Sequence, residues 1–116
     1  MKKCNVKIRI SNGFDTVIGP GKADLLEHII LTGSISSAAK EMNMSYRRAW
    51  ELIKTMNQSF DEPVVRAKTG GSHGGGAEIT EFGMKILGLY RAIVTKMLAS
   101  ADSEMSLIDR HLKSWK

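Results

Sequence analysis

The sequence predicts a mainly helical domain with a small β-hairpin, and three observations lead to it. Several segments carry apolar residues at helical spacing, and two of these segments are separated by only a few residues. Two short strand-like segments enclose a run rich in glycine, which is typical of a hairpin with a long tip. The length of 116 residues supports one domain with its own core, so we expect a single domain over residues 1–116.

The N-terminal part is expected to form a strand followed by a helix. Residues 4–11 alternate between apolar and polar side chains, which predicts a half-buried strand that Asn12-Gly13 ends. After the turn at residues 19–21, a helix is predicted over about residues 21–32, with Gly33 at its C-terminal end. Its apolar stripe is Ala23, Leu25, Leu26, Ile29 and Ile30.

Two helices with a short connection come next, over about residues 34–59. Ser34 is a suitable N-cap for a short helix whose narrow apolar face is Ile35, Ala38, Ala39 and Met42. Ser45 caps a third helix, over about residues 45–59, and Trp50 falls on its apolar stripe, so we expect Trp50 to pack in the core. Two helices joined in this way are the outline of a helix-turn-helix.

A hairpin and a long helix complete the chain. Residues 64–80 predict two strands around a glycine-rich tip, and Thr80 can cap a helix over about residues 81–113. The serines at 100, 103 and 106 are weak helix formers, so this stretch is either one bent helix or two. Apolar positions stepping by threes and fours predict a dimer interface, made of Leu87, Tyr90, Val94, Met97, Ala101, Met105 and Ile108.

The order of these elements is that of a winged helix-turn-helix, in which the third helix enters the DNA major groove and the hairpin is the wing. The net charge of +5 agrees with an anionic partner, and nucleic acid is the commonest one. We therefore expect double-stranded DNA to be the partner. The predicted DNA-binding residues are Ser45, Tyr46, Arg47, Arg48, Lys54, Arg66, Lys68, Thr69, Ser72 and His73.

The individual roles within this set stay open. Arg47 and Arg48 could each bond guanine or fork onto a phosphate. Ser45 could contact phosphate or act only as an N-cap, and Tyr46 could reach phosphate or turn toward the core. The tip at residues 69–76 lacks the spacing of a nucleotide-binding loop, and its His-Gly-Gly-Gly run has no accompanying nucleophile motif. A wing that approaches DNA fits its position better.

Other classes of function find little support in the composition. The single cysteine excludes a disulfide framework within one chain and a Cys-based zinc site, which favours a reducing compartment. No apolar run approaches the roughly 20 residues that span a bilayer. The basic N-terminus, residues 1–7, leads into alternating polar and apolar residues instead of the apolar run of an export signal, so a cytoplasmic location is expected. The three histidines lie in separate elements and no catalytic constellation is recognisable, so neither an enzyme nor a metal or other cofactor is expected.

Residues 33–57 and the following hairpin resemble the DNA-binding domain of the ModE family of molybdate-responsive transcription regulators. The similarity covers roughly residues 20–95 and depends on Ser45-Tyr46-Arg47-Arg48-Ala49-Trp50, Thr69-Gly70-Gly71 and Thr80-Glu81-Phe82-Gly83. It implies a winged-helix fold, a homodimer on a palindromic operator and a third helix that reads DNA. The helix-turn-helix outline also resembles the LysR family, which lacks this glycine run.

The resemblance also sets an expectation about ligands. Full ModE regulators carry C-terminal domains that hold molybdate, and this chain ends at Lys116, so molybdate is not expected to bind it. The leading hypothesis is a dimeric, sequence-specific DNA-binding regulator. The alternatives are a winged helix that serves only protein–protein interaction and a nonspecific architectural DNA-binding protein.

Overall fold

The computed structural model describes residues 4–68 and 76–113. This part of the chain is mostly helical, as the sequence predicts, and contains two small antiparallel hairpins, of which only the second was expected. The helices are α1 (Pro20–Thr32), α2 (Ile35–Glu41), α3 (Tyr46–Ser59), α4 (Glu81–Ser100) and α5 (Asp102–Arg110). The strands are β1 (Ile10–Ser11), β2 (Thr16–Ile18), β3 (Val65–Lys68) and β4 (Gly76–Ile79).

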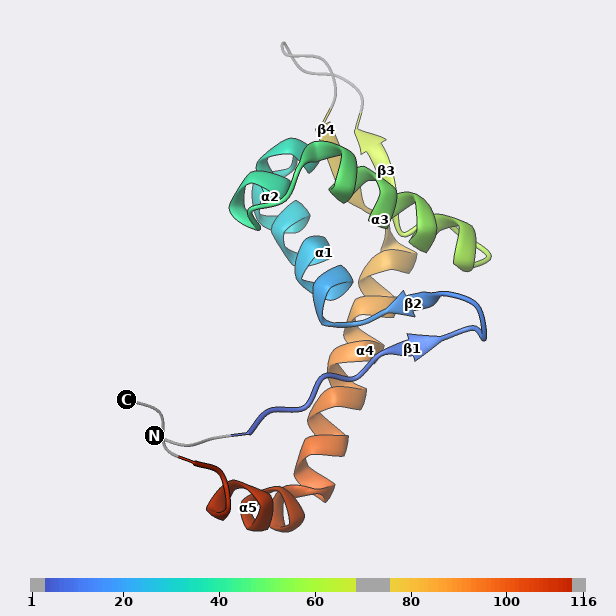
Figure 1. The fold of residues 1–116 in the computed structure, drawn as a ribbon. Helices are drawn as coiled ribbons and strands as arrows, with labels where there is room; N and C mark the ends of the chain where they lie inside the picture. Colours follow the sequence, from blue (N-terminus) through green and yellow to red (C-terminus); the bar gives the residue numbers. More distant parts are fainter. Residues whose placement is uncertain (1–3, 69–75, 114–116) are drawn as a thin grey trace.

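The first three helices and the β3–β4 hairpin form the packed body of the molecule (Figure 1). Helix α2 packs between α1 and α3, and β4 lies against α1. Helix α4 starts beneath the hairpin and extends away from it, with α5 at its far end (Figure 1). The largest side chains that are fully buried are Leu25, Leu26, Ile29, Met56 and Val64.

The predicted helix ends are set by local signals that the structure contains. Ser34 accepts a hydrogen bond from Ser37 N at 3.0 Å, and Thr80 accepts one from Gly83 N at 2.8 Å, so each caps its helix. Gly33 ends α1 with φ 72°, and its N–H bonds Ile29 O at 2.8 Å. These positions agree with the predicted starts of α2 and α4 and the predicted end of α1.

The strand predicted over residues 4–11 is wrong for most of its length. Only Ile10 and Ser11 pair with β2, and residues 4–9 have no assigned strand. The alternating pattern agrees with burial only in part: Val6 is 46% exposed, whereas Cys4 and Ile8 are half-buried. Their contacts are with helices, however: Cys4 N donates to Asp109 Oδ1 of α5 at 2.5 Å, and Ile8 O accepts from Tyr90 Oη of α4 at 2.7 Å.

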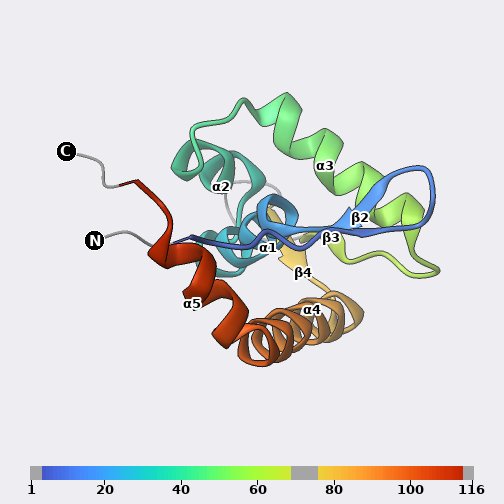
Figure 2. The same ribbon diagram turned by 60° about the horizontal axis from the view of Figure 1, so that its bottom comes forward.

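The stretch predicted as one bent helix or two is two helices. The break is at Ala101, where φ is −107° and ψ is 10°. The long α4 and the terminal α5 give the described chain an elongated shape of 54 × 34 × 23 Å. Figures 1 and 2 both place α3 and α5 at opposite ends of the molecule. No helix within residues 4–68 and 76–113 is long and apolar enough to cross a membrane.

Two apolar side chains expected in the core are instead exposed. Ile30 of α1 is 43% exposed, and Trp50 of α3 is 44% exposed, so the predicted core role of Trp50 is wrong. The buried residues of α3 are Ala49, Ile53 and Met56. Trp50 lies at the border of this buried stripe, where Lys54 Nζ is 5.3 Å from the centre of its ring. The Trp50 ring, which the apolar pattern had placed in the core, therefore contacts Lys54 and solvent.

Candidate nucleic-acid interface

Helix α3 presents a polar face with arginine at its first turn. Ser45 accepts a hydrogen bond from Arg48 N at 3.0 Å, which fixes the start of the helix. The Arg47 side chain is 90% exposed and its Nε lies 3.6 Å from Glu51 Oε1, one helical turn further on. An ion pair between such exposed groups is weak, so the guanidinium can exchange Glu51 for another anion.

The turn before α3 fixes that helix against α2. Asn43 adopts a left-handed conformation with φ 56°, which asparagine tolerates better than most residues. The N–H groups of Asn43 and Met44 bond Lys40 O and Ala39 O at 3.1 and 3.0 Å. Ala38 and Ala39 are buried, and such small side chains allow the two helices to approach closely. The short connection therefore holds the first turn of α3 in a defined direction.

The β3–β4 hairpin extends from the body beside the start of α3 (Figure 1). Ala77 N donates to Gly33 O at 3.0 Å, which ties β4 to the end of α1. A Cβ at Gly76 would lie 2.6 Å from the same Gly33 oxygen, so glycine is required for this approach. A small recess is lined by residues of α2, α3 and β4, including Ser34, Tyr46 and Ala77. The 55% exposed Tyr46 therefore faces the hairpin and solvent.

One of the two described cations of the hairpin is paired with a carboxylate. Arg66 Nε donates to Glu78 Oε2 at 2.7 Å across the two strands, although the Arg66 side chain is 62% exposed. Lys68 is exposed at the end of β3, opposite Gly76. The predicted contacts Thr69, Ser72 and His73 lie outside the described residues.

Asn57 is a residue that the sequence reasoning did not select, although it joins α3 to the hairpin. Its Oδ1 accepts from Val64 N at 2.8 Å, and its Nδ2 donates to Val65 O at 3.0 Å. The available signal was a polar amide on the apolar stripe, shortly before the turn at residues 61–63. A partly buried amide in such a place commonly satisfies backbone groups of a neighbouring segment. Asn57 thus helps to set the position of β3 relative to α3.

The residues predicted for a dimer interface fall into two groups. Leu87 and Tyr90 are 7% and 2% exposed and belong to the core of this chain, so their assignment to an interface is corrected. Their spacing marks the face of α4 that packs on the body. Val94, Ala101 and Met105 are half-buried, whereas Met97 and Ile108 are 51% and 58% exposed. On α4 and α5, the exposed apolar side chains that the prediction did not include are Met84, Leu89, Ile93 and Leu107.

The structure brings the predicted α3 residues and the described hairpin cations to one end of the molecule. The dimer residues that stay exposed lie on α4 and α5, toward the other end (Figure 2). Within the described residues, no group of three or more histidine, cysteine, aspartate or glutamate side chains could hold a metal ion. The arrangement offers cations and hydrogen-bond donors to an anionic surface.

Comparison with known proteins agrees with the resemblance noted in the sequence. The chain is 42% identical over 93 residues to the molybdenum-pterin-binding protein MopB of Rhodobacter capsulatus, which covers 78% of the chain and 34% of MopB. It is 45% identical over 71 residues to the DNA-binding transcriptional dual regulator ModE of Escherichia coli K12, covering 61% of the chain and 27% of that protein.

A third relative is the molybdenum transport protein ModE of Azotobacter vinelandii, 40% identical over 92 residues, with 76% of the chain and 34% of that protein covered. The chain thus spans about a third of the length of the curated relatives that it matches. No protein-family model matches it. The resemblance predicted from residues 33–83 is confirmed by these relatives.

Proposed function

We propose that this chain, a homologue of the ModE-family regulators, is a sequence-specific DNA-binding regulator of transcription. The observation that carries the proposal is the exposed, arginine-bearing first turn of α3, held by the tight turn from α2. A helix of this kind fits the major groove, where the residues of its N-terminal turn can reach base edges. The relative from Escherichia coli is named as a DNA-binding regulator, which supports the same role here.

The proposed architecture is a single winged helix-turn-helix domain. Residues 34–59 are the helix-turn-helix, with α3 as the recognition helix, and residues 64–80 are the wing. In this arrangement Arg47 contacts bases, and Lys68 and the tip of the hairpin contact the phosphate backbone. Backbone contacts position the protein on the duplex, and base contacts supply the sequence preference.

The proposed assembly is a homodimer that binds a palindromic operator through two copies of α3. Support comes from Leu89, Ile93 and Met97, which are spaced four residues apart on one side of α4 and are 53%, 37% and 51% exposed. Ile108 and Leu107 continue the exposed apolar residues onto α5, at 58% and 55%. A second copy packed here would remove this surface from water.

Selection of bound sequences from a random duplex pool tests the proposal. Purified protein is mixed with the pool at two salt concentrations, and the bound DNA is sequenced. We expect a two-fold symmetric motif and a binding constant that falls steeply with salt, because neutralised phosphates release counterions. Binding without enrichment would indicate a nonspecific architectural protein, and absence of binding at low salt would indicate a protein–protein interaction module.

Replacement of Arg47 assigns the base contact. Arg47→Ala is expected to weaken operator binding by about 1 to 3 kcal/mol and to relax preference at one base pair of each half-site. Lys85→Ala, an exposed cation on α4, is the matched control and should leave the preferred sequence unchanged. An unchanged footprint for Arg47→Ala would remove this arginine from sequence readout.

A further inference from the structure

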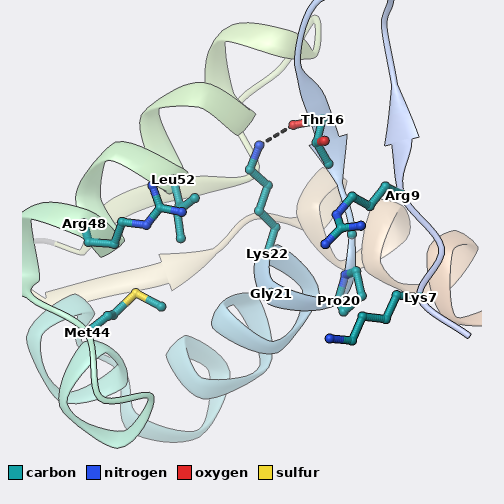
Figure 3. A pocket seen from close by; sticks show the side chains of 10 residues that line it. Lys7, Arg9, Thr16, Pro20, Gly21, Lys22, Met44, Arg48 and Leu52 are labelled. Carbon is teal, nitrogen blue, oxygen red and sulfur yellow. Dashed lines mark hydrogen bonds between the residues drawn. The ribbon is translucent and has the colours of Figure 1, made fainter. Parts of the chain in front are cut away.

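A cavity of about 440 Å³ lies between the N-terminal segment, the start of α1 and the flank of α3. We call it the α1 pocket. Its lining includes four cationic side chains, Lys7, Arg9, Lys22 and Arg48, and no carboxylate among the described residues that line it. Figure 3 shows that these side chains come from three separate segments and surround the same space.

Lys22 is the innermost of the four cations. The residue is only 9% exposed, and its Nζ donates to Thr16 O, as the dashed line in Figure 3 marks. An ammonium group has three N–H donors, so one carbonyl leaves donor capacity for a further acceptor. Burial of a charge without a counter-ion is costly, and an anion in the pocket would offset that cost.

The electrostatics of Lys22 agree with this arrangement. Burial lowers the pKa of Lys22, Asp15 of the β1–β2 turn raises it, and the nearby positive charge of Arg48 lowers it further. The net direction is downward, so the attraction of Asp15 does not compensate fully for burial and Arg48. Four cations line the pocket, against this one nearby carboxylate, so the pocket attracts an anion.

The start of α1 supplies a second feature of the pocket. Its cap residue Gly19 has no side chain to accept the backbone N–H groups of the first turn, and Pro20 follows directly. A Cβ at Gly19 would lie 3.1 Å from Arg9 Cγ, so glycine lets the Arg9 stem lie across the helix start. The positive end of the helix and the cations thus face the same cavity.

We propose that the α1 pocket binds a phosphate group, held by Lys22, Arg9 and Arg48. Arginine and lysine donors converging from several directions are the usual partners of a tetrahedral oxyanion. Arg48 belongs to α3, so the pocket borders the proposed DNA interface. The phosphate comes either from the DNA backbone beside α3 or from a free phosphorylated small molecule, and the DNA source rests on the proposed function.

The first arm of the test uses inorganic phosphate and free protein. Phosphate is titrated into isotopically labelled protein, with chloride replaced so that ionic strength stays constant, and amide chemical shifts are followed. We expect saturable shifts centred on residues 19–22 if the pocket accepts free phosphate. Arg9→Gln and Lys22→Met should each weaken this binding about tenfold or more, because each removes a charge-assisted hydrogen bond. Lys85→Gln, on exposed α4, should not.

The second arm uses the operator duplex and the same variants. If the pocket holds a backbone phosphate, Arg9→Gln and Lys22→Met weaken binding to all sequences about equally and reduce the salt slope by about one unit each. Lys85→Gln keeps the slope of the original protein. Arg9 is exposed, so its variant should fold even if the replacement of buried Lys22 disturbs the fold, which circular dichroism checks.

The outcomes separate the pocket from the proposed function. Binding of free phosphate that depends on Arg9 and Lys22 supports a phosphate site in the α1 pocket, even if the protein binds no DNA. The absence of DNA binding would refute only the proposed function. A lowered salt slope without free-phosphate binding assigns the pocket to the DNA backbone. The proposal of a phosphate site in the α1 pocket would be wrong if two results were found together. Phosphate would have to change amide chemical shifts over the whole basic surface and equally in all variants, and the salt slopes of DNA binding would have to stay unchanged.

Discussion

The first half of α4, residues 81–90, packs into the body of the molecule, whereas its second half and α5 remain largely open. Gly83, Leu87 and Tyr90 are the buried residues of α4, and α5 has none among its described residues. The two regions share the same helical backbone and a similar supply of apolar side chains. They differ in their packing, because the buried residues of α4 all lie in its first half, where Leu87 and Tyr90 belong to the core.

The difference shows that helix formation and packing respond to separate properties of the sequence. Caps and good helix formers suffice to define a helix, but tertiary contacts provide most of its stability in a protein. The open second half of α4, with exposed Ile93 and Met97, therefore gains most from a partner. This supports the proposed dimer at the open half of α4.

The largest expected effect on stability is the contrast between alanine substitutions at two glycines of α4. A Cβ at Gly83 would collide with Val64 O and lie 2.8 Å from Ile79 Cγ2, whereas a Cβ at Gly88 would meet nothing within 4 Å. Gly83→Ala should destabilise the protein by about 3 kcal/mol, because backbone must move. Gly88→Ala should be neutral or stabilise it by up to about 1 kcal/mol. Urea unfolding of both variants measures the contrast, and equal effects would contradict it.

Charge placed on the open half tests the proposed dimer. Met97→Glu should weaken self-association about tenfold or more, since a carboxylate would be buried without a partner, and should leave the fold of each chain intact. Thr95→Glu, exposed on another side of α4, is the control. Sedimentation velocity over a range of concentrations gives the association constant. If the original protein is a monomer at micromolar concentration, the dimer proposal is wrong.

Much of the fold could be predicted from the sequence because its signals are local. Ser34, Ser45 and Thr80 each bond a backbone N–H three residues further on, and Gly33 takes the left-handed conformation that ends a helix. Such signals depend on a few neighbouring residues. The order of the helices followed from them, and so did the exposed first turn of α3. The β3–β4 hairpin followed from its strand pattern, and the β1–β2 hairpin was not expected.

What the sequence could not predict depends on distant contacts. Residues 4–9 alternate like a strand, but their partners are α4 and α5. Trp50 fits the apolar period of α3, but it is 44% exposed and Lys54 lies over its ring. Tyr90 fits a dimer stripe equally well, but its face of α4 meets the core. The spacing of apolar residues identifies an apolar face, but it does not show which segment packs against that face.

Tyr90 is the contact through which residues 4–9 reach the packed half of α4. Its hydroxyl donates to Ile8 O at 2.7 Å, so Tyr90→Phe should cost about 1 kcal/mol near neutral pH. Burial raises the pKa of Tyr90 above its ordinary value of 10.0, an effect that Arg91 opposes and Asp24 supports. Above that pH the unfolded chain loses a proton that the folded chain keeps, so stability falls as pH rises.

The sign of this pH effect gives the test. Tyr90→Phe removes the ionisable group, so the stability advantage of the original protein should shrink between about pH 8 and about pH 11. Urea unfolding at several pH values measures the difference. Tyr46→Phe, at a tyrosine that is 55% exposed, is the matched control for the loss of a hydroxyl group. A stability difference between the original protein and Tyr90→Phe that increases with pH would contradict a raised pKa of Tyr90.

The smallest expected effect belongs to Arg91, at the boundary between the two halves of α4. Its guanidinium bonds Glu27 Oε2 at 2.8 Å and Asp24 Oδ1 at 3.2 Å, both on α1. All three side chains are between 39% and 53% exposed, so water and salt screen the interaction. Arg91→Ala should therefore cost about 1 kcal/mol or less, and the loss should decrease with added salt.

The location of the Arg91 contact predicts where a small loss of stability will be visible. Because this ion pair is where the second half of α4 begins, its removal should speed amide hydrogen exchange over residues 91–100 and change residues 81–90 little. Arg110→Ala, an exposed position on α5, is the control and should alter neither segment. Faster exchange throughout α4 would mean that the two halves open as one unit, and the boundary would then have to lie closer to the break at Ala101.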